Sequence, residues 1–149
     1  MRAVVQRVLR AQVQVDGKVV SSIGRGLLVL AGLHRADTDE DLSYIANKIL
    51  GLRVFDDEAG VMNLSLAEAG AELMVVSQFT LYGDARKGRR PSYSEAMPPG
   101  DAAGRFAAFV EMCASGFPGV KTGRFGADMH VEIVNDGPVT ILLDSSRAF

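Results

Sequence analysis

The stretch Gly26-Leu27-Leu28-Val29-Leu30-Ala31-Gly32-Leu33 decides how this chain folds. It is short and almost continuously apolar, a pattern typical of a β-strand that is buried on both faces. A second apolar segment, Glu72 to Leu81, predicts another buried strand, which becomes polar only at Ser77, Gln78 and Thr80. Two strands buried on both faces need cover on both sides, which predicts a layered α/β structure.

The residues before the first of these strands predict a β-hairpin. β-branched residues recur between residues 4 and 15, which favours an extended chain. Asp16-Gly17 is a strong signal for a tight turn, and Val19-Val20 begins the returning strand. Further strands are expected over residues 53–55, 120–125, 130–135 and 139–143.

Two segments predict amphipathic helices. In the first, Thr38 is the expected N-cap, acidic residues fill the first turn, and Gly51 is the expected C-cap. The second begins at Pro98-Pro99-Gly100-Asp101. Apolar residues repeat at helical spacing along each. The stripes are Leu42, Ile45, Ala46, Ile49 and Leu50 in the first helix and Ala102, Phe106, Phe109, Val110 and Cys113 in the second.

Because each helix is apolar on one side only, each must pack on a sheet. The expected fold is therefore a mixed, layered β/β/α structure of two packed, barrel-like sheets, with two main helices on one face. No linker, repeat or low-complexity segment divides the chain, so residues 1–149 are expected to form a single domain.

Composition places the chain among ordinary globular proteins. It has 149 residues, of which 48% are hydrophobic and 23% charged. No apolar run reaches the roughly 20 residues needed to cross a membrane. Charge within the first apolar stretch argues against a signal peptide, and the lone Cys113 excludes an internal disulfide and fits a reducing compartment. We therefore expect a cytoplasmic protein without a membrane partner.

The familiar catalytic signatures are absent from the sequence. The two histidines, His34 and His130, have no nearby second ligand, so no zinc site can be drawn. There is no nucleophile elbow, phosphate-binding loop or dinucleotide motif. Cys113 lies on an apolar stripe, which favours a structural thiol. We expect no metal and no cofactor, and an enzyme of this kind would rely on backbone dipoles, hydroxyls and its substrate.

Four segments depart from what a core requires, although each also has an ordinary explanation. The polar strand end Ser77-Gln78-Phe79-Thr80-Leu81 and the turn Asn135-Asp136-Gly137-Pro138-Val139-Thr140 are two of them. The third, residues 122–129, is unusually rich in glycine and can leave backbone open to a ligand. The fourth, Arg86-Lys87-Gly88-Arg89-Arg90, puts four cations into five residues, so RNA binding stays possible at a net charge of −2.

Together these segments resemble the D-aminoacyl-tRNA deacylase family. The two signatures of that family, Ser-Gln-Phe-Thr-Leu and Asn-x-Gly-Pro-x-Thr, stand intact at residues 77–81 and 135–140. Residues 1–8, 87–92 and 125–129 match as well, in the order and spacing of the family. Five ordered matches, from the first residue to near the last, make the resemblance specific.

The resemblance implies hydrolysis of the ester of D-aminoacyl-tRNA, and of glycyl-tRNA mischarged on tRNA(Ala), with rejection of L-aminoacyl-tRNA. It implies a homodimer with its site near the interface, where the Gly137-Pro138 turn of each protomer reaches into the partner's pocket. That turn would contain a cis peptide bond and present backbone carbonyls to the amino acid. Arg7 would hold the turn in place. The implied partner is the acceptor end of aminoacyl-tRNA and not DNA.

The resemblance also distributes roles among the remaining candidates. Ser77, Gln78, Phe79 and Thr80 would surround the ester and the terminal adenosine, with the N–H groups of Phe79 and Thr80 as oxyanion donors. An apolar wall on the adenine side would consist of Phe125, Gly126 and Met129. The tRNA phosphates would bind the basic cluster of Arg86, Lys87, Arg89 and Arg90.

Two mechanisms and two other functions stay open. Thr80 could attack the ester covalently, but a threonine hydroxyl needs a base and none lies nearby in sequence. Alternatively, the free 2′-hydroxyl of the terminal ribose could activate or orient water. The chain could also be a related deacylase of L-alanine from mismatched tRNA, or a non-catalytic module that binds the tRNA end. The intact motif around Gly137 and Pro138, together with Arg7, favours the D-specific enzyme.

Overall fold

β1 (Arg2–Val15) is the strand around which the sheet is organised. The computed structural model describes residues 1–148. Along one edge, β1 pairs antiparallel first with β3 (Gly26–Gly32) and then with β2 (Lys18–Ile23). Along its other edge it pairs antiparallel with β8 (His130–Asp144). The hairpin expected at residues 16–17 is therefore confirmed.

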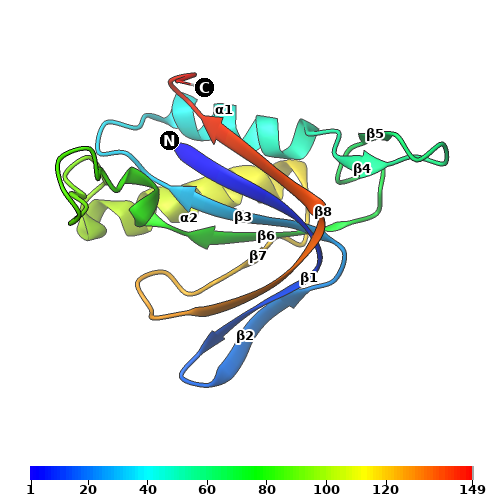
Figure 1. Ribbon diagram of the computed structural model, residues 1–149, viewed down its shortest axis with the longest axis horizontal. Helices are drawn as coiled ribbons and strands as arrows, with labels where there is room; N and C mark the ends of the chain where they lie inside the picture. The colour runs from blue at the N-terminus through cyan, green and yellow to red at the C-terminus, as the bar shows by residue number, and fades with distance from the viewer. Residues whose placement is uncertain (149) are drawn as a thin grey trace.

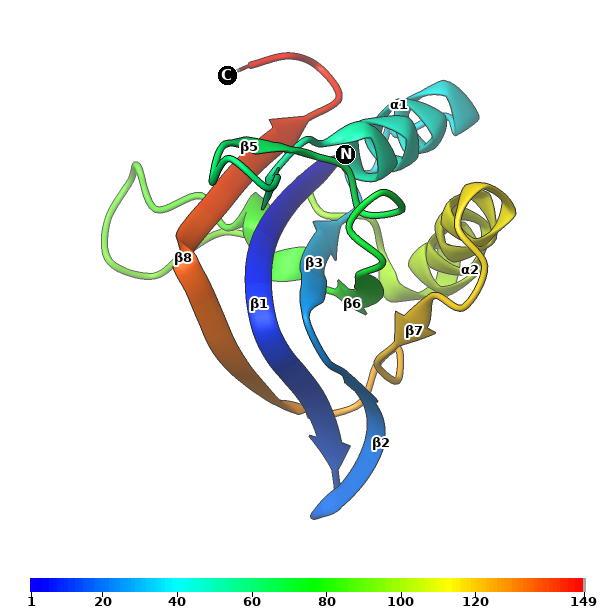
Figure 2. The same ribbon diagram turned by 90° about the vertical axis from the view of Figure 1, so that its right-hand side faces the viewer.

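The six-stranded sheet bends strongly about β1 and β8, so that its two ends face one another (Figures 1 and 2). Its order is β2-β1-β3-β6-β7, where β6 (Glu72–Ser77) runs parallel to β3 and to β7 (Lys121–Thr122). The expected barrel-like layering is confirmed, but the two main layers are halves of one bent sheet. A separate two-stranded sheet contains only β4 (Phe55–Asp56) and β5 (Met62–Leu64).

The central strands β3 and β6 are buried on both faces, as their apolar sequences predict. In β3, Leu27 and Val29 pack in the cluster under the helices, whereas Leu28 belongs to a second cluster inside the bend of the sheet. In β6, Val75 and Met74 divide between the same two clusters. One bent sheet thus supplies two cores, because alternate residues of a strand point to opposite faces.

Two helices cover one face of the sheet (Figure 2). α1 (Asp39–Gly51) begins at the predicted cap, where Asp41 accepts hydrogen bonds from the backbone N–H and hydroxyl of Thr38. The backbone bond from Thr38 is the main reason that the pKa of Asp41 falls to about 2. Leu52, and not Gly51, is the C-cap, because Gly51 completes the last helical turn.

α2 (Pro99–Gly116) follows the expected start, and four of its five predicted inward residues are buried. Val110 is only half-buried, since it lies at the margin of the apolar stripe. Neither helix in residues 1–148 has the length and apolar content to span a membrane.

Four strand predictions were wrong in extent. The strand expected over 53–55 contributes only Phe55 to β4, and that over 120–125 only the short β7. The segments 130–135 and 139–143 belong to one continuous strand, β8, because both pair with β1 on either side of a bulge.

The strand expected over 72–81 ends early, at Ser77. Its parallel partner β3 ends at Gly32. The last hydrogen bond between the two segments runs from the Gln78 N–H to the Ala31 carbonyl at 2.7 Å, and beyond it β3 offers no further backbone group for pairing. The chain then turns into the 3-10 helix η1 (Phe79–Tyr82). The polar residues of the sequence therefore mark the point at which the chain leaves the sheet.

Candidate active site

An apolar pocket of about 790 Å³ opens at the carboxyl ends of the parallel strands β3 and β6. Its walls come from the end of β6, the start of α2, the end of the glycine-rich segment 122–129 and the first residues of β8. The structure brings six of the candidate residues together here, namely Ser77, Gln78, Phe79, Phe125, Gly126 and Met129. Two segments almost 50 residues apart in sequence thus form one site.

The wall opposite Ser77 is broad and apolar. The rings of Phe125 and Phe106 pack in a tilted arrangement, with centroids 5.8 Å apart and planes at 37°. Phe106 comes from the inner stripe of α2, where its spacing predicts only a core residue. An apolar wall with little hydrogen-bonding capacity suits a flat ring better than it suits a charged group.

Thr80 lies beside the pocket and does not line it. Its exposed hydroxyl accepts a hydrogen bond from the side-chain amide of Gln78, and an amide cannot remove a proton from it. Tyr93 is the only titratable side chain of the lining, among residues 1–148. The geometry therefore provides no general base for a threonine nucleophile.

Two backbone donors stand next to the pocket without a partner. The N–H groups of Phe79 and Thr80 begin η1, so they have no acceptor within it. None of the hydrogen bonds formed among the described residues uses either group. Free N–H groups beside an apolar pocket can stabilise negative charge that develops on a bound carbonyl oxygen.

Gly137 and Pro138 lie in the bulge of β8, outside this pocket. Gln6 pairs with Thr140 and Val8 with Asn135, so residues 136–139 all stand opposite Arg7. The peptide bond between Gly137 and Pro138 is cis, and both residues are exposed.

The bulge and the pocket of one chain lie at opposite ends of β3. Arg7 faces Leu27 near the start of β3, whereas Ala31 near its end lines the pocket. At ~3.3 Å per residue, these two points are roughly 13 Å apart along the strand. The structure therefore does not bring Gly137 and Pro138 into the pocket of their own chain.

The guanidinium of Arg7 is buried beneath the bulge. It donates to the Val54 carbonyl at 2.7 Å and contacts the Asp56 carboxylate at 3.4 Å. Its Nε contacts the carboxylate of Asp136 at 3.2 Å and the carbonyl of the same residue at 3.4 Å. A Cβ at position 137 would stand 3.2 Å from this guanidinium, and the φ of +115° there also favours glycine.

The basic segment forms a loop whose ends are joined. The backbones of Asp84 and Ser92 exchange two hydrogen bonds, of 2.7 and 2.9 Å, at its base. Arg86 donates to both carboxylate oxygens of Asp84, which lowers the pKa of that carboxyl and balances the charge of Arg86 locally. Three other cations of the loop form no ion pair within residues 1–148: Lys87, Arg89 and Arg90.

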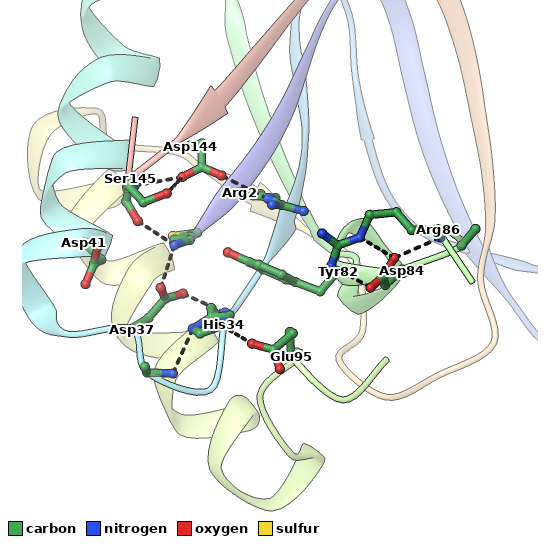
Figure 3. A pocket seen from close by; sticks show the side chains of 15 residues that line it. Arg2, His34, Asp37, Asp41, Tyr82, Asp84, Arg86, Glu95, Asp144 and Ser145 are labelled. Carbon is green, nitrogen blue, oxygen red and sulfur yellow. Dashed lines mark hydrogen bonds and ion pairs between the residues drawn. The ribbon is translucent and has the colours of Figure 1, made fainter. Parts of the chain in front are cut away.

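A second, polar hollow lies behind η1 (Figure 3). Tyr82 stands at its centre, with the Arg2 guanidinium 4.7 Å from its ring and the His34 ring at 5.2 Å. Burial raises the pKa of Tyr82. The charges pair with one another inside the hollow, since Arg2 binds Asp144 at 3.0 Å. Because these charged side chains bind one another, we interpret the hollow as a structural contact that holds η1 in place and not as a ligand site.

His34 and Glu95 close this hollow toward the start of α2. His34 Nδ1 accepts a hydrogen bond from the Ala36 N–H, which leaves Nε2 to bind Glu95 at 3.0 Å. This bond, together with Arg35, lowers the pKa of Glu95. A backbone bridge between His34 and Ala96 ties the same segment to the apolar pocket.

Comparison with known proteins identifies close relatives. The sequence profile described as "D-Tyr-tRNA(Tyr) deacylase" matches residues 4–144. Proteins named "D-aminoacyl-tRNA deacylase" from Thermosipho africanus (strain TCF52B) and Clostridium botulinum (strain Eklund 17B / Type B) are 58% and 56% identical over 149 residues, which is 100% of each chain. A solved structure, "c-Myc DNA Unwinding Element Binding Protein", is 46% identical, with a TM-score of 0.93 over 97% of this chain and 98% of that one.

Arg7→Met tests whether the buried guanidinium holds the bulge. Its loss leaves the Val54 carbonyl and the Asp136 carboxylate without their donor, so we expect the free energy of unfolding to fall by about 3 kcal/mol. Urea denaturation measures the change. Arg10→Met on the same strand is the matched control, because its ion pair with Glu132 is exposed and should be worth less than about 1 kcal/mol. Equal losses in the two variants would contradict this role of Arg7.

Proposed function

The chain belongs to the D-aminoacyl-tRNA deacylase family and is a hydrolase, and we propose that it selects D-aminoacyl and glycyl esters of tRNA through the backbone of Gly137 and Pro138. The observation that carries this function is the match to the family over residues 4–144, which includes the lining of the pocket at residues 76–79, 125–127 and 129. Glycyl-tRNA mischarged on tRNA(Ala) is included among the proposed substrates.

The proposed chiral filter uses backbone carbonyls. Pro138 has no N–H, so the exposed side of this bulge is rich in acceptors, and Arg7 holds it from beneath. Carbonyls fixed in this way accept hydrogen bonds from the substrate ammonium only when the substrate side chain points away from them. In an L-residue the side chain is inverted at Cα and collides with the turn. Glycine has no side chain and passes the same filter.

We propose that a second copy of the chain supplies this filter. The bulge does not reach the pocket of its own chain, and β8 pairs with β1 alone, so the other edge of β8 is unpaired within residues 1–148. Exposed Leu9 and Leu142 lie on these same two strands and would add apolar contact. A symmetric dimer would place each Gly137-Pro138 turn against the pocket of the partner.

For the hydrolysis itself, the geometry favours assistance by the substrate. Attack on the ester builds negative charge on the carbonyl oxygen, and the free N–H groups of Phe79 and Thr80 are positioned to bind it. No carboxylate or histidine of residues 1–148 lines the pocket to take a proton from water or from Thr80. The 2′-hydroxyl of the terminal ribose lies next to the ester and can orient the attacking water instead.

The acceptor end would be held at two places. The apolar wall around Phe125 suits the terminal adenine, which a ring can stack against. Unpaired cations of the loop, Lys87, Arg89 and Arg90, suit the phosphates, which position the substrate without reading its sequence. Of the four cations predicted to bind phosphate, Arg86 is the weakest candidate, since it already donates two hydrogen bonds to the carboxylate of Asp84.

Hydrolysis of D-tyrosyl-, L-tyrosyl- and glycyl-tRNA by the purified protein tests the proposed selectivity. We expect cleavage of the D-tyrosyl and glycyl esters, with the L-tyrosyl ester at least about 100-fold slower because its side chain meets the turn. L-Alanyl-tRNA is assayed beside these three, and its preferential cleavage would identify the related L-specific deacylase. Binding of all three without hydrolysis would identify a non-catalytic module.

Thr80→Ala tests the covalent route. If Thr80 is not the nucleophile, kcat should stay within about tenfold of the original enzyme, whereas removal of a covalent nucleophile costs on the order of 10⁴-fold or more. D-Tyrosyl-tRNA that ends in 2′-deoxyadenosine is the matched substrate, and we expect its hydrolysis to slow by about 100-fold or more. Full turnover of the deoxy substrate would refute assistance by the 2′-hydroxyl.

A further inference from the structure

Two exposed aromatic rings stand between the pocket and the basic loop. Phe79, the first residue of η1, is 57% exposed, and Tyr93 is 41% exposed. Their rings meet edge to face, with centroids 5.2 Å apart and planes at 69°. Because the two rings adjoin, they form one exposed apolar patch, a feature that often marks a binding site. The two rings are called the aromatic ledge below.

The ledge is part of a defined structure on both of its sides. Tyr93 directly follows Ser92, whose backbone closes the basic loop onto Asp84. Its ring lies on the chain at Gly83, where an added Cβ would stand 3.0 Å from Tyr93 Cε1. The ring therefore sits between the base of the loop and the end of η1, and a side chain at position 83 would press against it.

The ledge is also continuous with the pocket. Both rings belong to the pocket lining, together with Phe125 and Met129 on the opposite side. The loop itself projects from the end of the sheet between η1 and α2 (Figures 1 and 2). The two rings therefore adjoin the pocket and, through Ser92, the base of the loop that carries the unpaired cations Lys87, Arg89 and Arg90.

We propose that the aromatic ledge stacks the base of the penultimate nucleotide of the acceptor end. This inference rests on the proposed function, in which the terminal adenosine occupies the pocket. Proteins bind single-stranded nucleic acid by combining a basic surface along the backbone with aromatic rings under the bases. Here the rings follow the pocket and the cations follow the rings, which is the order in which a single strand presents its next base and phosphates.

The proposal separates two readings of Tyr93. If Tyr93 only shapes the pocket, its loss affects the ester and the terminal adenosine, and every substrate suffers alike. If it stacks the next base, its loss affects only substrates that have this base. Loss of one base–aromatic stack corresponds to roughly 5- to 150-fold in affinity. The phenolic hydroxyl has no part in stacking, so Tyr93→Phe should behave like the original enzyme.

The experiment measures kcat and KM for the original enzyme, Tyr93→Ala and Tyr93→Phe. The substrates are D-tyrosyl-tRNA, the same tRNA with an abasic penultimate nucleotide, and D-tyrosyl-adenosine. With intact tRNA, Tyr93→Ala should raise KM by roughly 5- to 150-fold while kcat changes little. The abasic tRNA should impose a loss of at least this size on the original enzyme and a smaller loss on Tyr93→Ala, in which only the ring of Phe79 is left to contact the base.

Three results would overturn the inference. The first is an unchanged KM of Tyr93→Ala on intact tRNA. The second is a KM of Tyr93→Ala on the abasic tRNA that is raised by the full product of the two separate effects. The third is a loss for Tyr93→Ala on D-tyrosyl-adenosine as large as its loss on intact tRNA. An original enzyme that hydrolyses neither D-tyrosyl-tRNA nor D-tyrosyl-adenosine would overturn the proposed function, and the inference with it. An active original enzyme with any of the three results overturns the inference alone.

Discussion

The guanidinium of Arg7, on β1, lies buried between the bulge of β8 and the segment before the small sheet. It binds the carbonyl of Val54, just before the small sheet, and it binds Asp136 in the bulge of β8. Because a buried cation without its partners is costly, the fold has a strong preference for the one arrangement that satisfies it. β8 can therefore continue past four residues that do not pair with β1, and the exposed turn has a fixed position. The proposed selectivity depends on that rigidity.

In the proposed mechanism, backbone N–H groups and the substrate itself perform the catalysis, because few reactive side chains lie at the pocket. Among residues 1–148, the pocket holds no carboxylate or histidine, and the buried Cys113 has its pKa raised to about 12 by burial, so it is no nucleophile at neutral pH. The acidic and basic groups of the polar hollow bind one another and support η1 from behind. What remains at the pocket is hydrogen bonding and shape, which suits discrimination between mirror-image substrates.

The sequence predicts those features that depend on local pattern. The apolar run at 26–33 and the stripes of the two helices predict the central layers correctly, because burial on two faces or on one leaves a distinct periodicity. The end of β6 at Ser77 depends on where β3 stops, and the unbroken course of β8 depends on its pairing with β1 on both sides of the bulge. Neither the end of β6 nor the continuity of β8 can be predicted from the residues of that strand alone, because each is set by a distant segment. The placement of Thr80 outside the pocket follows from the same early turn.

The site could be anticipated only through the resemblance to a family. Nothing in spacing or composition links residues 77–79 to 125–129, which the fold brings to one pocket. Tyr93 escapes prediction entirely, since one aromatic residue in a polar loop carries no periodic signal. The position of the bulge away from its own pocket likewise appears only in three dimensions, and it is what makes a second copy of the chain part of the proposed site.

Mixing two inactivated forms of the protein measures this central claim most directly. One form would have Gly137 and Pro138 replaced by alanine, which removes the fixed carbonyls that bind the substrate ammonium, and the other would have its pocket filled by Ala127→Trp. If each turn serves the pocket of the partner, a heterodimer contains one site with both parts intact, and re-associated mixtures should hydrolyse D-tyrosyl-tRNA at up to about a quarter of the original rate. Mixtures that form heterodimers and stay as inactive as the two separate forms would contradict the account.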